Sequence, residues 1–522
     1  MDSDPNRRAT EPARRAAKVF LRWICLIVLL LQGLTPNCFS FAAEPLPPTH
    51  VDDFIGRPRV IIMSDIGNEP DDQMSFVRLL LYSNEFEIEG IVATTSTWQK
   101  SAVHPETMHA LIEAYGKVRS NLLLHAKGWP TAEELDGRVF NGQPGYGLAA
   151  IGADKMSAGA EAIMRAVDRD DARPLWICIW GGANTLAQAL LHVRATRTAG
   201  EADRFVGKMR VYSITDQDDT GPWIRREFPN LFYIVQPSTQ KGDDYYYATW
   251  TGISGDVYYR NGEGADFSTV TNEWLEANIR GKGAMGKWYP KYAFIMEGDT
   301  PSFLGLIDNG LASWWNPSWG GWGGRYKFRQ PYGETHPIWT QGGDLFPRVN
   351  SQDTVTGTDG KLHTSDQATI WRWREAYQHD FAARMDWTIK PFAEANHNPV
   401  VVVNGQSGTA PIFMDAVVGE PLILDAGKSH DPDNQPLHYA WFQYGEAGAG
   451  SGESLAAINI AEANSSKATV TPTATCRPTW IQLPNAKCPP EGVAHVILSV
   501  TDNGSPSLTS YRRIVLNVKA VK

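Results

Sequence analysis

Cysteine is scarce in this chain, with five among 522 residues. Cys25 and Cys38 fall in the first 42 residues, so three remain for the rest of the protein. Cys178 lies inside the apolar stretch LWICIW, where we expect a buried, unreactive thiol. Cys476 and Cys488 bracket a short loop, and in an oxidising compartment they could form a disulfide. A metal site built from cysteine thiolates is therefore excluded.

A basic surface is also missing. The formal net charge is -10, and no block of Lys and Arg occurs outside the N-terminus. Proteins that bind nucleic acid carry such a block, so we expect no nucleic-acid partner. The sequence also lacks a phosphate-binding loop, a His-Glu-x-x-His zinc motif and a Ser/His/Asp nucleophile signature.

A long hydrophobic run is absent too. The apolar segment WICLIVLLLQGL near the N-terminus is shorter than the roughly 20 residues that a membrane span needs. Six basic residues precede it and FSFAA follows it, a pattern typical of a secretory signal cleaved after Ala42. We therefore expect a signal peptide at residues 1–42, a secreted or periplasmic protein and no stable membrane anchor. An uncleaved anchor is the alternative.

Apolar strands and amphipathic helices alternate from Arg59 to about Val235. Such a pattern predicts an α/β domain with a mostly parallel sheet and helices on both faces. Ligands bind at the carboxyl ends of the strands in sheets of this kind. The expected strands are 59–64, 87–96, 121–126, 174–180, 208–214 and 230–235, and the expected helices are 73–83, 105–118, 157–169 and 184–196.

The pattern changes after residue 395, where short alternating strands are separated by Asp-Pro, Asn-Gly and Ser-Pro turns. These features predict an all-β Ig-like sandwich at 396–522, a possible carbohydrate-binding module, after an α/β domain at 43–395 that ends in a helix near 366–387. The segment DAGKSHDPDNQPLHYAW resembles the turn of polycystic-kidney-disease-type and cadherin-like modules. We expect Asp431 and Asp433 to make Asx turns there, with a second Ca²⁺ site as the alternative.

Four acidic residues gather in the segment SDIGNEPDD, directly after the first strand. Asp65, Glu69, Asp71 and Asp72 lie within eight residues, and like charges so close together are costly unless a cation lies among them. Carboxylates without cysteine or paired histidine are the ligands that Ca²⁺ or Mg²⁺ prefers. Asp72 could alternatively cap the helix that follows.

The acidic segment, the helix after it and the strand IEGIVATTS resemble the start of the inosine-uridine-preferring nucleoside hydrolases, with two extra residues in the loop. The resemblance implies that Asp65 and Asp72 bind Ca²⁺, that Asp71 holds sugar hydroxyls and that Asp65 is also the general base. The segment ICIWGGANTLAQAL resembles the strand and turn whose backbone carbonyl binds the metal, here at Trp180. The segment EGDTPSFLGLI resembles the stretch that carries the last ligand, here Asp299.

The substrate pocket departs from that family. Gln99 or Trp98 stands where the family has a sugar-binding asparagine, and Gly298 replaces a histidine. The loop TDQDDTGPWIRREFPN brings Asp218 and Arg225 in place of sugar-binding Asn and Glu. We therefore expect a substrate other than a nucleoside. Glu69, Asp218 and His336 are the candidates for an acid that protonates the leaving group.

The same motifs, together with the C-terminal domain, resemble a group of secreted bacterial proteins that pair a nucleoside-hydrolase-like domain with an Ig-like domain. Some of those proteins are named cellulose-binding. The tryptophans of SWWNPSWGGWGGRY, Trp319 among them, fit two interpretations. They could be exposed rings that stack on sugars, or they could pack in the core of the domain.

The leading hypothesis is a secreted, Ca²⁺-dependent hydrolase of glycosidic bonds in a carbohydrate or glycoconjugate. One alternative is a non-catalytic protein that binds a polysaccharide such as cellulose, and another is an extracellular nucleosidase. The sequence gives no indication of an oligomeric state.

Overall fold

The computed structural model describes residues 51–52, 56–238, 245–255, 262–341, 351–450, 452–477 and 487–521. The expected signal peptide, with Cys25 and Cys38, lies outside these residues. No helix in the described part of the chain is both long enough and apolar enough to cross a membrane.

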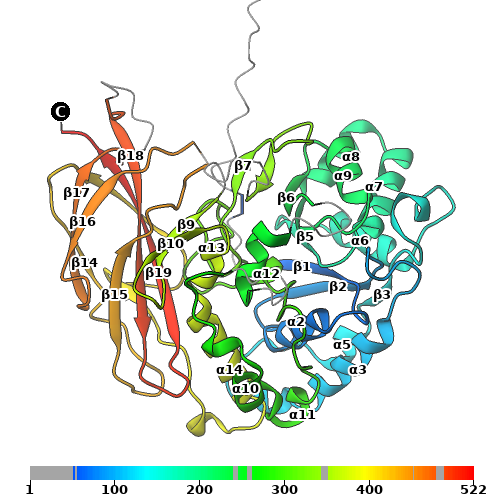
Figure 1. Cartoon of the computed structure of the whole chain (residues 1–522), viewed down its shortest axis with the longest axis horizontal. Coiled ribbons are helices and arrows are strands. Elements are labelled where there is room, and N and C mark those ends of the chain that lie inside the picture. The colour runs from blue at the N-terminus through cyan, green and yellow to red at the C-terminus, as the bar shows by residue number, and fades with distance from the viewer. Residues whose placement is uncertain are drawn as a thin grey trace, which may run out of the picture. The chain divides into compact units, whose positions relative to one another are not determined.

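A central sheet of eight strands has the order β3-β2-β1-β4-β5-β6-β8-β7 (Figure 1). All neighbouring pairs are parallel except β7 with β8, so the expected parallel α/β sheet is confirmed. The strands are β1 (Arg59–Ser64), β2 (Glu87–Ala93), β3 (Val139–Asn141), β4 (Leu175–Ile179), β5 (Met209–Thr215), β6 (Phe232–Gln236), β7 (Lys327–Arg329) and β8 (Ile338–Thr340).

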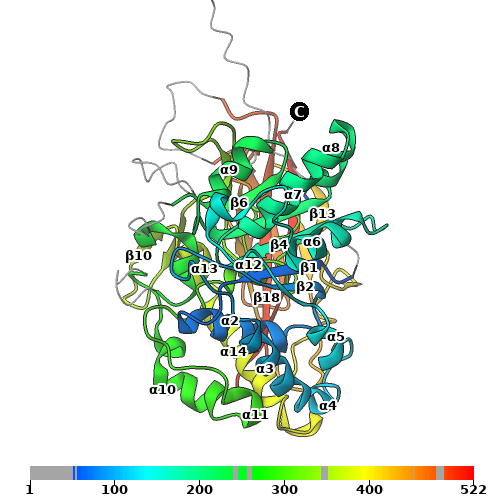
Figure 2. The same cartoon turned by 90° about the vertical axis from the view of Figure 1, so that its right-hand side faces the viewer.

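Both faces of the sheet are buried. Successive side chains of a strand point to opposite faces, so each strand contributes residues to two apolar clusters. In β1, Val60 and Ile62 pack in the apolar cluster that includes α2 and α3, whereas Ile61 and Met63 pack in the cluster that includes α6 and α7. Figure 2 shows these two helix layers on opposite sides of β1 and β2. The helices of this layer system are α2 (Pro70–Leu81), α3 (Pro105–Gly116), α4 (Arg119–Leu122), α5 (Ala132–Asp136), α6 (Ala158–Asp168), α7 (Asn184–Thr196), α8 (Ala199–Gly207) and α9 (Thr220–Glu227).

The strand predicted at 121–126 is wrong. The segment forms the end of helix α4 and the turns after it, and β3 occupies the edge of the sheet beside β2. Leu122 is buried, but Leu123 and Leu124 are 43% and 54% exposed. Three consecutive leucines therefore look like a buried strand in the sequence, although only one of them enters the core.

Short helices and loops lead from β6 to a closing helix, as expected. The short elements between β6 and the closing helix α14 (Arg374–Asp386) are η2 (Tyr245–Tyr247), η3 (Thr249–Ile253), η4 (Ser268–Val270), α10 (Asn272–Leu275), η5 (Glu276–Arg280), α11 (Gly283–Gly286), α12 (Pro301–Leu304), β9 (Asp353–Thr356), β10 (Leu362–Ser365) and α13 (Ala368–Trp371). Two further short helices lie elsewhere: η1 (Gly147–Ala150) precedes α6, and η7 (Phe392–Glu394) follows α14.

The C-terminal part is all-β, as predicted. One sheet has the order β13-β19-β18-β15 and another has the order β14-β17-β16. Cys476 and Cys488 form a disulfide, which confirms that pairing, and Cys178 is buried with the pKa of its thiol raised to about 12 by burial. The strands are β11 (Val402–Val403), β12 (Gln406–Ser407), β13 (Ile412–Val417), β14 (Leu422–Asp425), β15 (His438–Gln443), β16 (Ala457–Ala461), β17 (Lys467–Ala474), β18 (Glu491–Thr501) and β19 (Thr509–Lys519).

The α/β part and the β part share an apolar core. The ring of Trp373 lies 5.7 Å from that of Tyr444 and 5.5 Å from that of Tyr511, measured between centroids. Arg513 of β19 is fully buried and donates to the carbonyl of Leu311 at 2.6 Å. We call this shared region, where α14 and the 309–325 loop meet β15, β18 and β19, the domain seam.

Candidate functional site

The acidic segment lies where β1 meets α2. Glu69 is the N-cap of the helix, and Asp71 and Asp72 occupy its first turn. A helix N-terminus favours negative charge, which explains why two acids are tolerated there. Gly67 has a φ of +117°, and a Cβ at this position would come within 2.8 Å of the His104 ring, so the turn requires glycine.

Three carboxylates converge at this end of the sheet. Asp71, Asp72 and Asp299 each offer an oxygen, and these oxygens lie within 4.8 Å of one another. Asp72 and Asp299 are buried, and Asp71 is half-buried. Burial raises the pKa of Asp71 to about 8, with the charges of Glu69 and Asp65 adding to the effect. We call Asp65, Asp71, Asp72 and Asp299 the acidic cluster.

The other members of the cluster have raised pKa values for the same reasons. Burial raises the pKa of Asp65, and it raises the pKa of Asp72 and Asp299 well above the ordinary value. For Asp299, the charges of Asp72, Asp71 and Asp65 add to burial, so all four carboxyls share one electrostatic environment. A cation among them would remove that repulsion.

Two oxygens of the cluster have no hydrogen-bond donor in the described residues. These are Oδ1 of Asp65 and Oδ2 of Asp299, and both are buried. A buried acceptor without a donor is costly, so such atoms call for an explanation. A bound cation provides one, and an all-oxygen ligand set suits Ca²⁺.

Trp180 directly follows β4 and comes next to Asp65. Its backbone N–H donates to the carbonyl of Met63 at 2.8 Å, and its own carbonyl accepts from Nε2 of Gln217 at 2.6 Å. Its indole N–H donates to Ser302 Oγ, which in turn donates to the carbonyl of Asp299. Trp180 is therefore tied to the loop that carries Asp299.

Glycine at 181 keeps Trp180 and Asp65 close. A Cβ on Gly181 would lie 2.7 Å from Oδ1 of Asp65, closer than real Cβ contacts come. The side chain of Gln217 also ends here, and its Oε1 is buried without a donor in the described residues. The sequence analysis missed Gln217, whose position in a loop between β5 and α9 gives no pattern to recognise.

Gln99 and Trp98 lie at the edge of the site. Gln99 Nε2 donates to the backbone carbonyl of Asp65 at 3.2 Å, so its amide supports the acidic segment. Trp98 is 44% exposed, which leaves its ring accessible to a ligand. Ser96 fixes this turn, because its Oγ accepts from the N–H groups of both residues.

Asp218 and Arg225 are both buried. Oδ1 of Asp218 accepts from the N–H of Thr220 at 2.9 Å, and burial raises the pKa of this carboxyl to about 6. Arg225 forms a two-bond ion pair with Asp216 at 2.8 and 2.9 Å and also pairs with Glu334. These contacts give Arg225 a structural role in holding its loop.

The tryptophan-rich segment packs in the core. Trp314, Trp319 and Trp322 are 5%, 2% and 2% exposed. Trp319 stacks on Trp315 with ring centroids 5.8 Å apart, and His495 of β18 lies against its edge. The exposed-ring interpretation of Trp319 is therefore wrong: the ring fills the domain seam and is not available to a sugar.

Gly298 stands beside the cluster, and no larger residue fits there. A Cβ on Gly298 would lie 2.9 Å from Oδ2 of Asp71 and 3.2 Å from the ring of Trp250 in η3. Trp250 and Asp71 therefore both border Gly298, and the sequence analysis missed this position of Trp250. His336, one of the suggested acids, is half-buried in the loop that also carries Glu334, and burial lowers its pKa.

In the β part, Asp431 makes the expected Asx turn. Its Oδ1 accepts from the N–H groups of Asp433 and Gln435 at 2.8 and 3.0 Å. Asp433 pairs with His397, whose Nδ1 lies 3.0 Å from its Oδ1.

A family profile described as "Cellulose-binding Sde182, nucleoside hydrolase-like domain" matches residues 59–326, which is more than half of the chain. The chain belongs to this family. A second profile, "Cellulose-binding protein Sde0182, C-terminal domain", matches residues 421–518. No curated protein matches the chain.

Among solved structures, the chain resembles a nucleoside hydrolase-related hypothetical protein from Saccharophagus degradans that is associated with carbohydrate metabolism. The two share 35% identity with a TM-score of 0.70, over 89% of this chain and 100% of that one. The PKD domain of the KIAA 1837 protein also matches, with 22% identity over 22% of this chain and 93% of that one. Its TM-score of 0.15 is too low to support a conclusion.

Proposed function

We propose that this protein is a Ca²⁺-dependent hydrolase that cleaves glycosidic bonds in a carbohydrate or glycoconjugate. The observation that carries the proposal is the convergence of Asp71, Asp72 and Asp299 beside Asp65, with buried oxygens on Asp65 and Asp299 that have no donor in the described part of the chain. The family description and the carbohydrate association of the Saccharophagus relative support the substrate class.

The ligands would be carboxylate oxygens of Asp72 and Asp299, one of Asp65 or Asp71, and the carbonyl of Trp180. Bound calcium would make a nearby water a stronger acid and neutralise the charge of the cluster. This donor set fits the ion, because every atom in it is an oxygen that a hard cation prefers.

Residues of the acidic cluster would accept the proton, bind the sugar and stabilise the transition state. Oδ1 of Asp65, which has no donor among the residues that the structure describes, would accept a proton from the attacking water, and the amide of Gln99 donates to the Asp65 carbonyl. Asp71 is half-buried, whereas Asp72 and Asp299 are buried, so Asp71 is the most accessible of these three carboxylates. It would accept hydrogen bonds from two sugar hydroxyls. The negative charges beside the sugar would stabilise an oxocarbenium-like transition state.

Export fits the same proposal. The N-terminal pattern of residues 1–42 favours a secreted or periplasmic protein, and the disulfide between Cys476 and Cys488 is suited to an oxidising compartment.

The test is the release of reducing sugar from cellulose, xylan and pectin by the Ca²⁺-loaded protein. We expect release from at least one polymer, its loss with a chelator and its loss in Asp65→Ala. Calorimetry should still detect Ca²⁺ binding to Asp65→Ala, because Asp71, Asp72 and Asp299 remain. An Asp65→Ala protein that keeps full activity would refute the proposed role of this residue.

The second candidate is a non-catalytic polysaccharide-binding protein on the same scaffold. The family description favours it, and so does Gly298, because this position cannot supply a leaving-group acid. This candidate predicts sedimentation with insoluble cellulose without any release of sugar. Base release from inosine or uridine, followed by absorbance, would instead indicate a nucleosidase.

A further inference from the structure

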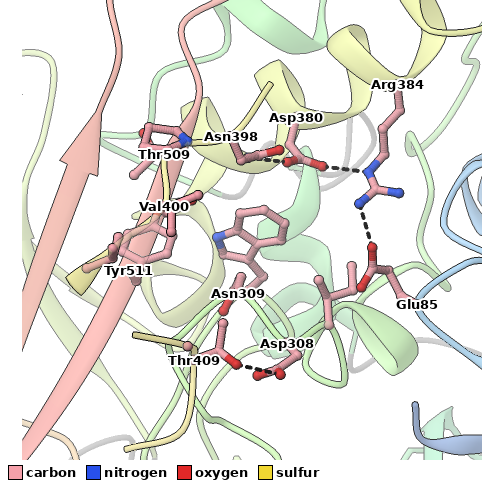
Figure 3. Close-up of a pocket in the computed structure, with 16 residues that line it drawn as sticks. Glu85, Asp308, Asn309, Asp380, Arg384, Asn398, Val400, Thr409, Thr509 and Tyr511 are labelled. Atoms are coloured by element: carbon pink, nitrogen blue, oxygen red, sulfur yellow. Dashed lines mark hydrogen bonds and ion pairs between the residues drawn. The ribbon is translucent and has the colours of Figure 1, made fainter. Parts of the chain in front are cut away.

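A cavity lies in the domain seam, apart from the acidic cluster. It has a volume of about 290 Å³, and none of the four acidic-cluster residues lines it. Its walls come from α14, the loop after α12, the 398–401 linker, the 408–409 turn and β19 (Figure 3). Both parts of the chain therefore contribute to one cavity.

The guanidinium of Arg384, which lines the cavity, makes four hydrogen bonds with its five N–H groups. Arg384 donates through Nε to Asp380 at 3.0 Å and through Nη2 to Glu85 at 2.8 Å (Figure 3). Its Nη1 donates to the carbonyl of Leu81 at 3.0 Å and to the side-chain oxygen of Asn84 at 2.8 Å. Arg384 therefore positions two carboxylates and has little left to donate to a ligand.

Two further donors on the wall are also in use. Asn398 Nδ2 donates to Asp380 at 2.9 Å, and the hydroxyl of Thr409 donates to Asp308 at 2.6 Å (Figure 3). A carboxylate can accept about four hydrogen bonds. Asp380 already accepts from Arg384, Asn398 and the hydroxyl of Tyr82, so most of the spare acceptor capacity lies on Asp308.

The same wall carries the amide of Asn309 and the hydroxyls of Thr509 and Ser510. A matching ligand therefore donates hydrogen bonds to Asp308 and can also accept them from these groups.

The remaining wall is apolar and aromatic. Trp322, Tyr511, Ile307 and Val400 line it, and Val400 is 37% exposed at the opening. Flat apolar surfaces beside fixed carboxylate and amide groups suit a ring that has C–H faces and a rim of hydroxyls. The volume is close to the lower end of the roughly 300–1,000 Å³ usual for small-molecule sites, which suits one or two sugar rings.

We propose that this seam cavity, with Asp308 and Asp380 as acceptors, binds a sugar unit of a neutral saccharide. The inference rests on the proposed carbohydrate specificity, but it assigns a binding site separate from the acidic cluster. A bound sugar contacts residues on both sides of the seam, so binding also resists separation of the two parts of the chain.

The experiment measures the binding of cellotriose, xylotriose and mannotriose to the full chain by calorimetry. Two variants test the cavity by independent means. Asp308→Ala removes an acceptor, and Val400→Trp places a bulky ring at the opening. We expect each variant to weaken the binding of at least one trisaccharide by roughly tenfold or more.

Two controls locate the effect. Asp415→Ala removes an exposed carboxylate that pairs with Lys519 on the β part, and it should leave saccharide affinity unchanged. Asp299→Asn alters the acidic cluster and should abolish the response to Ca²⁺, so it reports on saccharide bound at that cluster and not on saccharide bound in the seam cavity. Circular dichroism and melting temperature establish that each variant is folded.

Other outcomes overturn the inference. Wild-type protein that binds none of the three trisaccharides at millimolar concentration rules out the site as proposed. Binding that survives both cavity variants places the sugar outside the cavity and overturns the inference. Binding that is lost only in Asp299→Asn places the sugar at the acidic cluster and leaves the proposed function intact. Spermidine that binds in the cavity in place of the sugars identifies a cation site.

Discussion

The guanidinium of Arg78 and the carboxylate of Glu297 form an ion pair in which both side chains are fully buried. Arg78 lies on α2, two turns after Asp71 and Asp72, and Glu297 lies two residues before Asp299. Tyr289 and Thr300 donate further hydrogen bonds to Glu297, at 2.7 and 2.9 Å. The pair therefore fixes the distance between the two chain segments that supply the acidic cluster.

Glu297→Gln should lower both stability and calcium affinity. Loss of one partner leaves the Arg78 charge buried without compensation, which costs about 3–5 kcal/mol in similar cases. Urea denaturation measures the first effect and calorimetry with Ca²⁺ the second. Glu113→Gln is the matched control, because Glu113 pairs with Lys117 on the surface. This substitution should change the free energy of unfolding by less than about 1 kcal/mol. Equal stability of the two variants would contradict the positioning role.

Asp299→Asn should stabilise the calcium-free protein and remove its response to calcium. The substitution keeps the shape of the side chain but removes one of several buried like charges, so the free energy of unfolding without calcium should rise. Melting temperature with a chelator and with Ca²⁺ tests both effects. Asp359→Asn, at an exposed turn, should retain the wild-type response. A normal calcium shift in Asp299→Asn would remove Asp299 from the ligand set.

Gly181→Ala should damage the site without unfolding the protein. The new methyl group would lie 2.7 Å from Oδ1 of Asp65, so this carboxylate must move. We expect calcium affinity to fall by roughly tenfold or more, about 1.4 kcal/mol, measured by calorimetry. Gly207→Ala is the control, because a Cβ there meets nothing within 4 Å. If both variants bind calcium equally, Asp65 is not held against the Gly181 turn.

Asp353 should make the domain seam sensitive to acid. Burial alone would raise its pKa, but the guanidinium groups of Arg325 and Arg372 hold the pKa below the ordinary value. Because the folded pKa is the lower one, this carboxylate stabilises the fold above the unfolded pKa of about 3.9. That contribution is lost as the pH falls through the folded pKa.

Asp353→Asn tests this acid sensitivity. The variant should be less stable than wild type at pH 7, by about 3–5 kcal/mol, because the buried guanidinium of Arg325 and the half-buried one of Arg372 lose their counter-charge. The difference should shrink as the pH falls below about 4, because Asp353 takes up a proton first in the unfolded chain and only at lower pH in the folded protein. Denaturant melts at several pH values measure it. A difference that stays constant down to the acid limit would show that the Asp353 charge is not the cause.

The parallel sheet and the acidic segment could be predicted because their signals are local. Each buried strand is a continuous apolar run, and SDIGNEPDD follows the first one directly. Asp299 also had a local signal, an acid just before a short Thr-Pro helix start. The sequence thus nominated all four acids that the structure brings into one electrostatic environment.

The rest of the site depends on contacts between distant loops. Gln217 reaches the carbonyl of Trp180, and Trp250 fills the space beside Gly298, but neither contact leaves a periodic pattern. The sequence also could not decide whether Trp319 is buried or exposed, because residues in a glycine-rich loop do not follow a periodic pattern that separates buried from exposed positions. Its partners come from β18 and from Phe413 of β13, about a hundred or more residues later in the chain.

The shared core of the seam sets an order of events during synthesis. Trp322 and Trp373 are made long before Tyr511 and Arg513, which lie in the last strand and complete their packing. Until β19 has left the ribosome, the α/β part carries an uncovered aromatic face. The last strand thus completes the packing of the α/β part. A chain that stops near residue 395 would leave the aromatic face exposed to solvent and would tend to aggregate.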